Sequence, residues 1–246
     1  MMENFWTFFS FPLNLLLALI WAAGWGWMYK GHPRCAAVRF LLSPAATVSS
    51  IIFLLAACLW IGFSGDRQFV RSIFFVLVLL YLQTVLYLIL LRGWKGSDGS
   101  VRWRFLLIHA GLLLALGAGF WGAPDSYELR VQLAPGQAAE TAYRLDGSVT
   151  GPGYELKLDD HDMKVSDDGR PSYVEAFVSV DGAGPVWISV NHPYQLSMAE
   201  SVYLTSVSER SCVLQIVREP WRYAALAGII MLLAGAFLLF IKGPRR

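Results

Sequence analysis

His109 combines a chemically active side chain with a surrounding sequence in which that side chain is costly. It stands near the start of residues 103–121, an apolar run long enough to cross a bilayer. An imidazole in hydrocarbon needs a partner, so a histidine inside a membrane is a candidate functional residue. Imidazole is a common metal ligand and binds haem iron axially. The residue alone therefore leaves two interpretations open: an intramembrane ligand, or a histidine bonded to a neighbouring helix or reaching the headgroups.

Small residues follow His109 at helical spacing. Gly111, Ala115 and Gly119 recur every four positions and allow the backbone of another helix to approach closely. A ligand beside such a face suits a flat macrocycle held between helices, and six-coordinate haem needs two axial ligands. The other histidines all lie outside the predicted spans: His32, His161 and His192. We therefore expect a second intramembrane ligand to come from another chain.

Two of these histidines have simpler explanations than metal binding. His192 precedes Pro193, which favours extended backbone and ends a strand, so we predict a structural or docking role for the pair. His161 lies in the acidic segment 159–162, which we predict to be a solvated loop. The sequence has no Ser-His-Asp motif, no phosphate-binding glycine loop and no HExxH. It therefore predicts no catalysis by this chain alone.

Five apolar blocks supply the helices that must position His109. Hydrophobic residues make up 56% of the 246 residues. A span needs about 20 predominantly apolar residues. The blocks that satisfy this are residues 8–29, 44–64, 71–91, 103–121 and 222–241. The first lacks a basic leader and a cleavage site, so we expect a permanent helix rather than a signal peptide. The sequence predicts a five-span α-helical bundle in a lipid bilayer, with no nucleic-acid partner.

Basic residues predict the orientation of this bundle. Lysine and arginine are concentrated in the loops 30–43 and 92–104 and in the tail 242–246. Five spans put all three on one side, which is then cytoplasmic. The N-terminus faces outward, as does the loop 65–71 in spite of its two arginines. Residues 123–221 are external.

The external segment differs in character from the rest of the chain. It contains 15 Asp and Glu residues against 7 Lys and Arg residues. Six runs alternate apolar and polar positions, as half-buried strands do: residues 127–133, 154–158, 173–180, 186–190, 202–207 and 212–217. Turn-forming pairs such as Pro135–Gly136 separate them. We predict an antiparallel β domain, residues 123–221, inserted between spans four and five, with residues 1–122 and 222–246 forming the membrane part.

The cysteines and tryptophans receive structural interpretations. Cys35, Cys58 and Cys212 fall in a cytoplasmic loop, a span and the external domain, so none can pair without crossing the membrane. There is no CxxC motif, which makes thiol chemistry at Cys212 a weak alternative function. The tryptophans near the end of the first helix predict an aromatic belt at the membrane surface: Trp21, Trp25 and Trp27.

Three segments together resemble the ResB family, also called CcsB, a membrane subunit of the System II machinery for cytochrome c maturation. They are residues 39–62, which run from RFLLSP to WIG; residues 109–114, HAGLLL; and residues 190–221, from VNHP to CVLQIVREPW. The resemblance extends over about residues 39–241. The helix at 8–29 is additional to the four of that family, and Glu219 stands where the family has Asp.

The resemblance implies a role in haem handling at the bacterial cytoplasmic membrane. In this family ResB pairs with CcsA, and the complex carries haem outward and attaches it to the CxxCH thiols of apocytochrome c. By position, His109 corresponds to a ligand of haem b in transit. Gly111, Ala115 and Gly119 then line the haem passage or the interface with CcsA.

The same resemblance limits what this chain does by itself. The external histidine pair and the tryptophan-rich loop that present haem for attachment belong to CcsA, so this chain is expected to be a non-catalytic subunit of the haem lyase. The alternative is a haem-free, membrane-tethered scaffold whose acidic external domain binds another protein.

Overall fold

The fold is described from a computed structural model of the chain. It describes residues 9–65, 69–70, 72–139, 141–144, 147–151, 153–165, 171–182, 184–208 and 210–242. The chain divides into two compact units. One comprises Met1–Ala123 and Trp221–Arg246, and the other comprises Pro124–Pro220. The first is helical and the second is built of strands.

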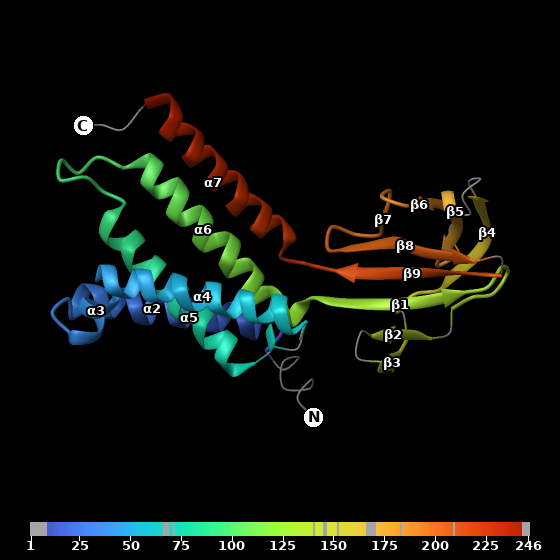
Figure 1. Ribbon diagram of the computed structural model, residues 1–246, viewed down its shortest axis with the longest axis horizontal. Helices are drawn as coiled ribbons and strands as arrows, with labels where there is room; N and C mark the ends of the chain where they lie inside the picture. The colour runs from blue at the N-terminus through green and yellow to red at the C-terminus, as the bar shows by residue number, and fades with distance from the viewer. Residues whose placement is uncertain are drawn as a thin grey trace. The chain divides into compact units, whose positions relative to one another are not determined.

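In the part of the chain that the structure describes, the helical unit contains one short helix and five long ones (Figure 1). They are α2 (Leu13–Gly31), α3 (Ala36–Leu41), α4 (Pro44–Ser64), α5 (Ile73–Gly93), α6 (Trp103–Gly122) and α7 (Arg222–Lys242). Four of them, α4 to α7, are long and apolar enough to cross a membrane. At 19 residues α2 is the shortest of the five, and it carries Asn14 and Lys30 in its apolar sequence. Of the five predicted spans, four are thus observed among the described residues as helices capable of crossing a membrane.

Local sequence determines where the membrane helices begin and end. The Ser43 hydroxyl accepts a 3.2 Å hydrogen bond from the Ala46 amide, and Pro44 occupies the first turn of α4. Such a cap contributes about 1 kcal/mol to helix stability. Gly65 ends α4 with a φ of +66°, a left-handed conformation that suits glycine. Ser72 caps α5 in the same way by accepting from the Phe75 amide.

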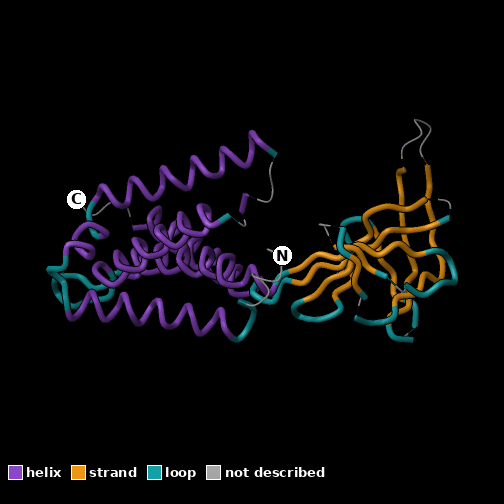
Figure 2. The backbone as a smooth tube through the Cα atoms, turned by 90° about the horizontal axis from the view of Figure 1, so that it is seen from below, coloured by secondary structure: helices purple, strands orange, loops and turns teal. Residues whose placement is uncertain are grey.

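The basic loops meet at one end of the helical unit. The α2–α3 connection, the α5–α6 loop and the C-terminal end of α7 lie together at this end (Figures 1 and 2). Helix α6 begins here, and His109 follows Trp103 by six residues. At 1.5 Å per residue this places His109 about 9 Å along the helix axis.

The second unit consists of two antiparallel sheets. Its strands are β1 (Tyr127–Leu133), β2 (Ala142–Arg144), β3 (Val149–Thr150), β4 (Leu156–Val165), β5 (Pro171–Val180), β6 (Val186–Ser189), β7 (Tyr194–Gln195), β8 (Glu200–Ser208) and β9 (Ser211–Arg218). One sheet has the order β3-β2-β1-β9-β8-β7 and the other the order β4-β5-β6. Alternate apolar residues of both sheets form one core in which Val131, Val178 and Leu214 are fully buried. The predicted antiparallel β structure is confirmed.

The loop predicted at residues 159–162 is wrong. These residues continue β4, which pairs with β5 from Leu156 to Val165. An irregularity between Leu158 and Asp160 shifts the register there. A bulge accommodates one extra residue without ending the ladder. Because the bulge interrupts the alternation of apolar and polar residues, the acidic half of β4 cannot be recognised as a strand from the sequence.

Candidate functional site

The His109 side chain is oriented by its own helix. Its Nδ1 lies 2.9 Å from the carbonyl oxygen of Phe105, one turn earlier in α6. A carbonyl oxygen only accepts, so Nδ1 carries the proton and donates this bond. The neutral ring then has a lone pair on Nε2. Among the residues that the structure describes, none is hydrogen-bonded to Nε2, and the imidazole is therefore set up to bind through that atom.

An aromatic and cationic column supports this ring. The Phe105 and His109 rings are stacked, with centroids 3.9 Å apart and planes at 23°. The Arg102 guanidinium lies 5.1 Å from the centroid of the Phe105 ring. Gly93 of α5 lies so close to the Phe105 ring that a Cβ there would overlap it. Phe105 is thus held between two helices, and its ring restricts the rotation of His109.

The small residues after His109 pack mainly against α7. A Cβ on Gly111 would lie 2.7 Å from the carbonyl oxygen of Gly228, and a Cβ on Gly228 would lie 2.6 Å from the amide nitrogen of Ala115. Contacts below 3 Å do not occur for real side chains, so these backbones touch only because the residues are small. At Gly119, by contrast, a Cβ would meet nothing within 4 Å. The face expected to line a passage or a partner is therefore covered at Gly111 and Ala115 by the last helix of this chain.

Polar contacts join α2, α5 and α6 in a way that the sequence analysis missed. The Asn14 amide donates to the Trp121 carbonyl at 2.8 Å, and Trp21 Nε1 donates to Thr84 Oγ1 at 3.2 Å. Gln83 is 1% exposed, and neither of its amide atoms has a hydrogen-bond partner among the described residues. Isolated Asn, Gln and Thr residues within apolar runs were the available signal, because such groups need partners in a bilayer.

The tryptophan belt stays a prediction, and two of its three members face the helical bundle. Trp21 donates its hydrogen bond inside the bundle and Trp25 packs against a buried cluster that includes Leu88. Trp27 is 66% exposed, as a belt residue is. Residues 21 and 25 are four apart and share a helix face, whereas residue 27 lies on another face.

The histidines of the second unit occupy strands and turns. His192 lies in the turn between β6 and β7, where its amide donates to the Ser189 carbonyl at 3.0 Å. Asn191 has a φ of +67°, a left-handed conformation that allows the chain to reverse direction in this turn. His161 belongs to β4, and its Nε2 lies 3.1 Å from the carbonyl oxygen of Ser208 in the other sheet. The described residues contain no cluster of three or more His, Cys, Asp or Glu side chains arranged to hold a metal ion.

The comparison with family models covers α6 and most of the strands. Residues 98–213 match the model described as the ResB-like family. This segment is similar to the ResB-like family. The matched segment contains His109, the small residues after it, and the pair His192 and Pro193. The segment 39–62, which also resembles the family, and Glu219 lie outside the match.

Two further comparisons accompany this match. A solved structure named Cytochrome c Heme Lyase CcmF aligns with a TM-score of 0.42 and 17% sequence identity. The alignment covers 96% of the present chain and 46% of the solved chain, so the present sequence spans less than half the length of the solved one. A comparison with curated proteins finds no match.

The cysteines of the chain differ in their accessibility. Cys212 is 0% exposed, and burial raises the pKa of its thiol to about 11. A thiol with this pKa is roughly one part in ten thousand thiolate at pH 7. Cys35 is partly exposed. Because the thiolate is the nucleophile, these environments argue against thiol chemistry at Cys212.

We expect a maleimide reagent to label Cys35 but not Cys212 in the folded protein. The measurement is mass spectrometry of the detergent-purified chain after labelling at pH 7, with a denatured sample in which both thiols react. Labelling of native Cys212 at the rate of the denatured sample would contradict its burial.

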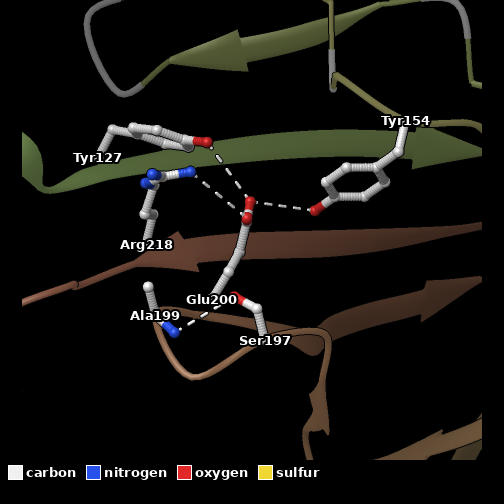
Figure 3. Close-up of polar contacts among 6 residues, drawn as sticks. All are labelled: Tyr127, Tyr154, Ser197, Ala199, Glu200 and Arg218. Carbon is white, nitrogen blue, oxygen red and sulfur yellow. Dashed lines mark hydrogen bonds and ion pairs between the residues drawn. The ribbon is translucent and has the colours of Figure 1, made fainter.

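A carboxylate cluster ties together the strand ends closest in sequence to α6 and α7 (Figure 3). Glu200 Oε1 accepts hydrogen bonds from the hydroxyls of Tyr127 and Tyr154, at 3.4 and 3.3 Å. Glu200 Oε2 lies 3.9 Å from the Arg218 guanidinium. Burial, with the negative charge of Glu200 beside it, raises the pKa of Tyr154 above its usual range. The cluster joins the first residues of β1 and β8 to the last residue of β9.

We expect Tyr154→Phe to lower the free energy of unfolding at pH 8. We also expect the variant to lose less of this free energy than the wild type when the pH is raised to 10.5. The lost hydrogen bond contributes about 0.5–1.5 kcal/mol. Because the pKa is raised in the folded state, its stabilising effect is present below the unfolded pKa, about 10, and is lost as pH rises above it. Thermal unfolding of the full chain at pH 8 and pH 10.5 measures both effects. Tyr143→Phe, at an exposed position, is the control, and equal pH dependence in both variants would contradict the assignment.

Proposed function

We propose that this ResB-like chain is a non-catalytic membrane subunit in cytochrome c maturation, and that His109 is an axial ligand of haem b carried as substrate. The single observation that supports this most is the orientation of His109 within the matched segment. Its Nδ1 is bonded to the Phe105 carbonyl, which leaves Nε2 for iron. The resemblance of the sequence to the ResB family supplies the nature of the substrate.

The residues present fit a haem ligand. Histidines that bind metals donate the other ring nitrogen to a carbonyl or carboxylate, which fixes the tautomer and raises the basicity of the ligand. The Phe105 carbonyl has this role here, and the stacked Phe105 ring holds the imidazole plane. Haem supplies the iron centre when it is bound. His109 orients it, and the apolar surroundings of α6 exclude water.

The arrangement that we propose in the membrane has five spans, with α2 as the fifth helix beside α4 to α7. The end of the helical unit that carries the basic loops faces the cytoplasm of a bacterium, in accordance with the bias of lysine and arginine toward that side. The β unit, residues 124–220, then faces outward, and the N-terminus is also outside. This orientation puts His109 in the cytoplasmic half of the bilayer.

The proposed partners are a CcsA-type membrane protein and apocytochrome c. With His109 as the ligand from α6, a second axial ligand within the bilayer is supplied by the CcsA-type chain. Gly111 and Ala115 pack against α7, so the contact between α6 and the partner is assigned to the later part of this face, where Gly119 is exposed. The acidic β unit is proposed to support the partner or to receive the basic apocytochrome.

The test is co-expression of this chain with a CcsA-type partner and a reporter apocytochrome c in a strain that lacks its own maturation system. The readout is covalent haem in the reporter, measured by haem stain against total reporter protein. We expect wild-type chain to support maturation and His109→Ala to lower it at least tenfold, with His161→Ala as the matched control. Normal cytochrome c maturation with the His109→Ala variant would contradict the role of His109 as a haem ligand. If the reporter acquires covalent haem equally well without this chain, the result favours the alternative of a haem-free scaffold.

A further inference from the structure

An open pocket of about 680 Å³ lies at the turn between α2 and α3. Trp27 and Met28 contribute from the last turns of α2, and residues 31–35 form the remaining wall. Its volume is in the range of about 300–1,000 Å³ that is typical of small-molecule sites. The helix that carries this pocket lies outside the segment 98–213 that matches the ResB-like family.

The turn that forms this pocket is anchored on both sides. The His32 amide donates to the Met28 carbonyl at 2.9 Å, and the Cys35 amide donates to the His32 carbonyl at 3.0 Å. Directly after the turn, Val38 of α3 is fully buried. The backbone of this turn is therefore fixed by hydrogen bonds, and most of the side chains that line the pocket are exposed.

The pocket gathers the side-chain types that bind haem iron. These are the imidazole of His32, the thioether of Met28 and the thiol of Cys35. Neither ring nitrogen of His32 is hydrogen-bonded to any residue that the structure describes. The His32 ring lies edge-on to Trp27, with centroids 5.0 Å apart and planes at 77°. This leaves the imidazole nitrogens for an incoming ligand.

Two further residues suit the remainder of a metalloporphyrin. Arg34 is exposed at the pocket, and a guanidinium pairs with carboxylates in a planar, two-bond geometry. Trp27 is 66% exposed and offers an indole face to a flat macrocycle. An anionic phospholipid would account for Arg34 and Trp27, but it makes no use of three iron-binding side chains in one pocket.

We propose that this pocket is a second haem site, in which His32 binds the iron, Arg34 pairs with a porphyrin carboxylate and Trp27 contacts the macrocycle. The inference rests on the proposed function, since it makes the pocket the place where haem is taken up before it reaches His109. Both positions lie toward the same end of the helical unit, where the α2–α3 connection and the start of α6 are found (Figures 1 and 2).

The test is a titration of the detergent-purified full chain with ferric haem, followed by the Soret band, in wild-type and in His109→Gly backgrounds. In the His109→Gly background we expect one site to remain, and His32→Ala to weaken it at least tenfold. Arg34→Gln should weaken it several-fold. His161→Ala is the control and should leave the affinity unchanged.

The outcomes separate this inference from the proposed function. If His109→Gly removes all haem binding, or if His32→Ala with Arg34→Gln leaves the affinity unchanged, the pocket is not a haem site, and the role of His109 is unaffected. If His109→Gly binds as much haem as the wild type and His32→Ala alone removes all of it, the pocket binds haem and the proposed role of His109 fails. Loss of copurified phosphatidylglycerol in the pocket variants, with unchanged haem affinity, would assign the pocket to lipid and overturn the inference.

Discussion

Replacing His109 by glycine is expected to abolish the Soret band of haem held in the membrane by the complex with its CcsA-type partner, and added imidazole is expected to restore it. The substitution removes the ring whose Nδ1 is bonded to Phe105 and opens a space of the size of imidazole. Free imidazole then supplies the missing iron ligand. The measurement is the absorption spectrum of the purified complex with and without about 10 mM imidazole. All samples carry His32→Ala, which removes the proposed pocket site, so that the spectrum reports only the haem bound at His109.

The control for this experiment is Leu114→Gly. Leu114 lies in the same helix and is 38% exposed, so its replacement introduces the same helix-weakening residue without removing a ligand. Glycine costs about 1 kcal/mol in a helix interior, and both variants carry this cost. Equal loss of haem in both variants, without rescue by imidazole, would attribute the effect to helix stability and contradict the ligand role of His109.

Gly111→Leu is expected to separate α6 from α7 and to prevent the helical unit from reaching its native packing. At this position a Cβ would lie 2.7 Å from two backbone atoms of α7, and backbone cannot move aside as a flexible side chain can. Overpacking of a well-fitted core typically costs about 1–3 kcal/mol, and a leucine against backbone lies at the upper end of that range. The measurement is the thermal stability of the detergent-purified chain by size-exclusion chromatography after heating.

Gly119→Leu provides the matched comparison for the seam between α6 and α7. Gly119 is in the same helix two turns later, and a Cβ there meets nothing within 4 Å. We expect its thermal stability to remain close to that of the wild type in the isolated chain. If both leucine variants unfold at the same temperature, close packing of α6 on α7 does not depend on Gly111. A loss of CcsA binding restricted to Gly119→Leu would support the partner face proposed for α6.

The sequence predicted helices best where caps and composition agree. The predicted span 44–64 coincides with α4 because Ser43 and Pro44 begin the helix and Gly65 ends it. Strand β1 coincides with the alternating run 127–133 for a similar reason, since one of its faces is buried and the other is not. Both signals are local, and neighbouring residues decide them.

Other elements had no local signal strong enough to be recognised. Helix α3 is six residues long, and it is held by the burial of Val38 rather than by caps or length. Strands β2, β3 and β7 have two or three residues each, too few for a period to be seen. They exist because longer strands such as β1 and β8 offer them backbone partners.

By itself, the sequence determined that His109 lies in a membrane helix, that small residues follow it, and that an antiparallel β unit interrupts the membrane part. Hydrophobicity and periodicity are properties of consecutive residues, so they are readable without the fold. Only the tertiary structure decided that α7 covers Gly111, that Trp21 points to Thr84, and that Nδ1 of His109 is bonded to Phe105. These depend on which helix faces pack together and on side-chain rotamers, because many pairings of apolar faces bury similar area and backbone fit selects one of them.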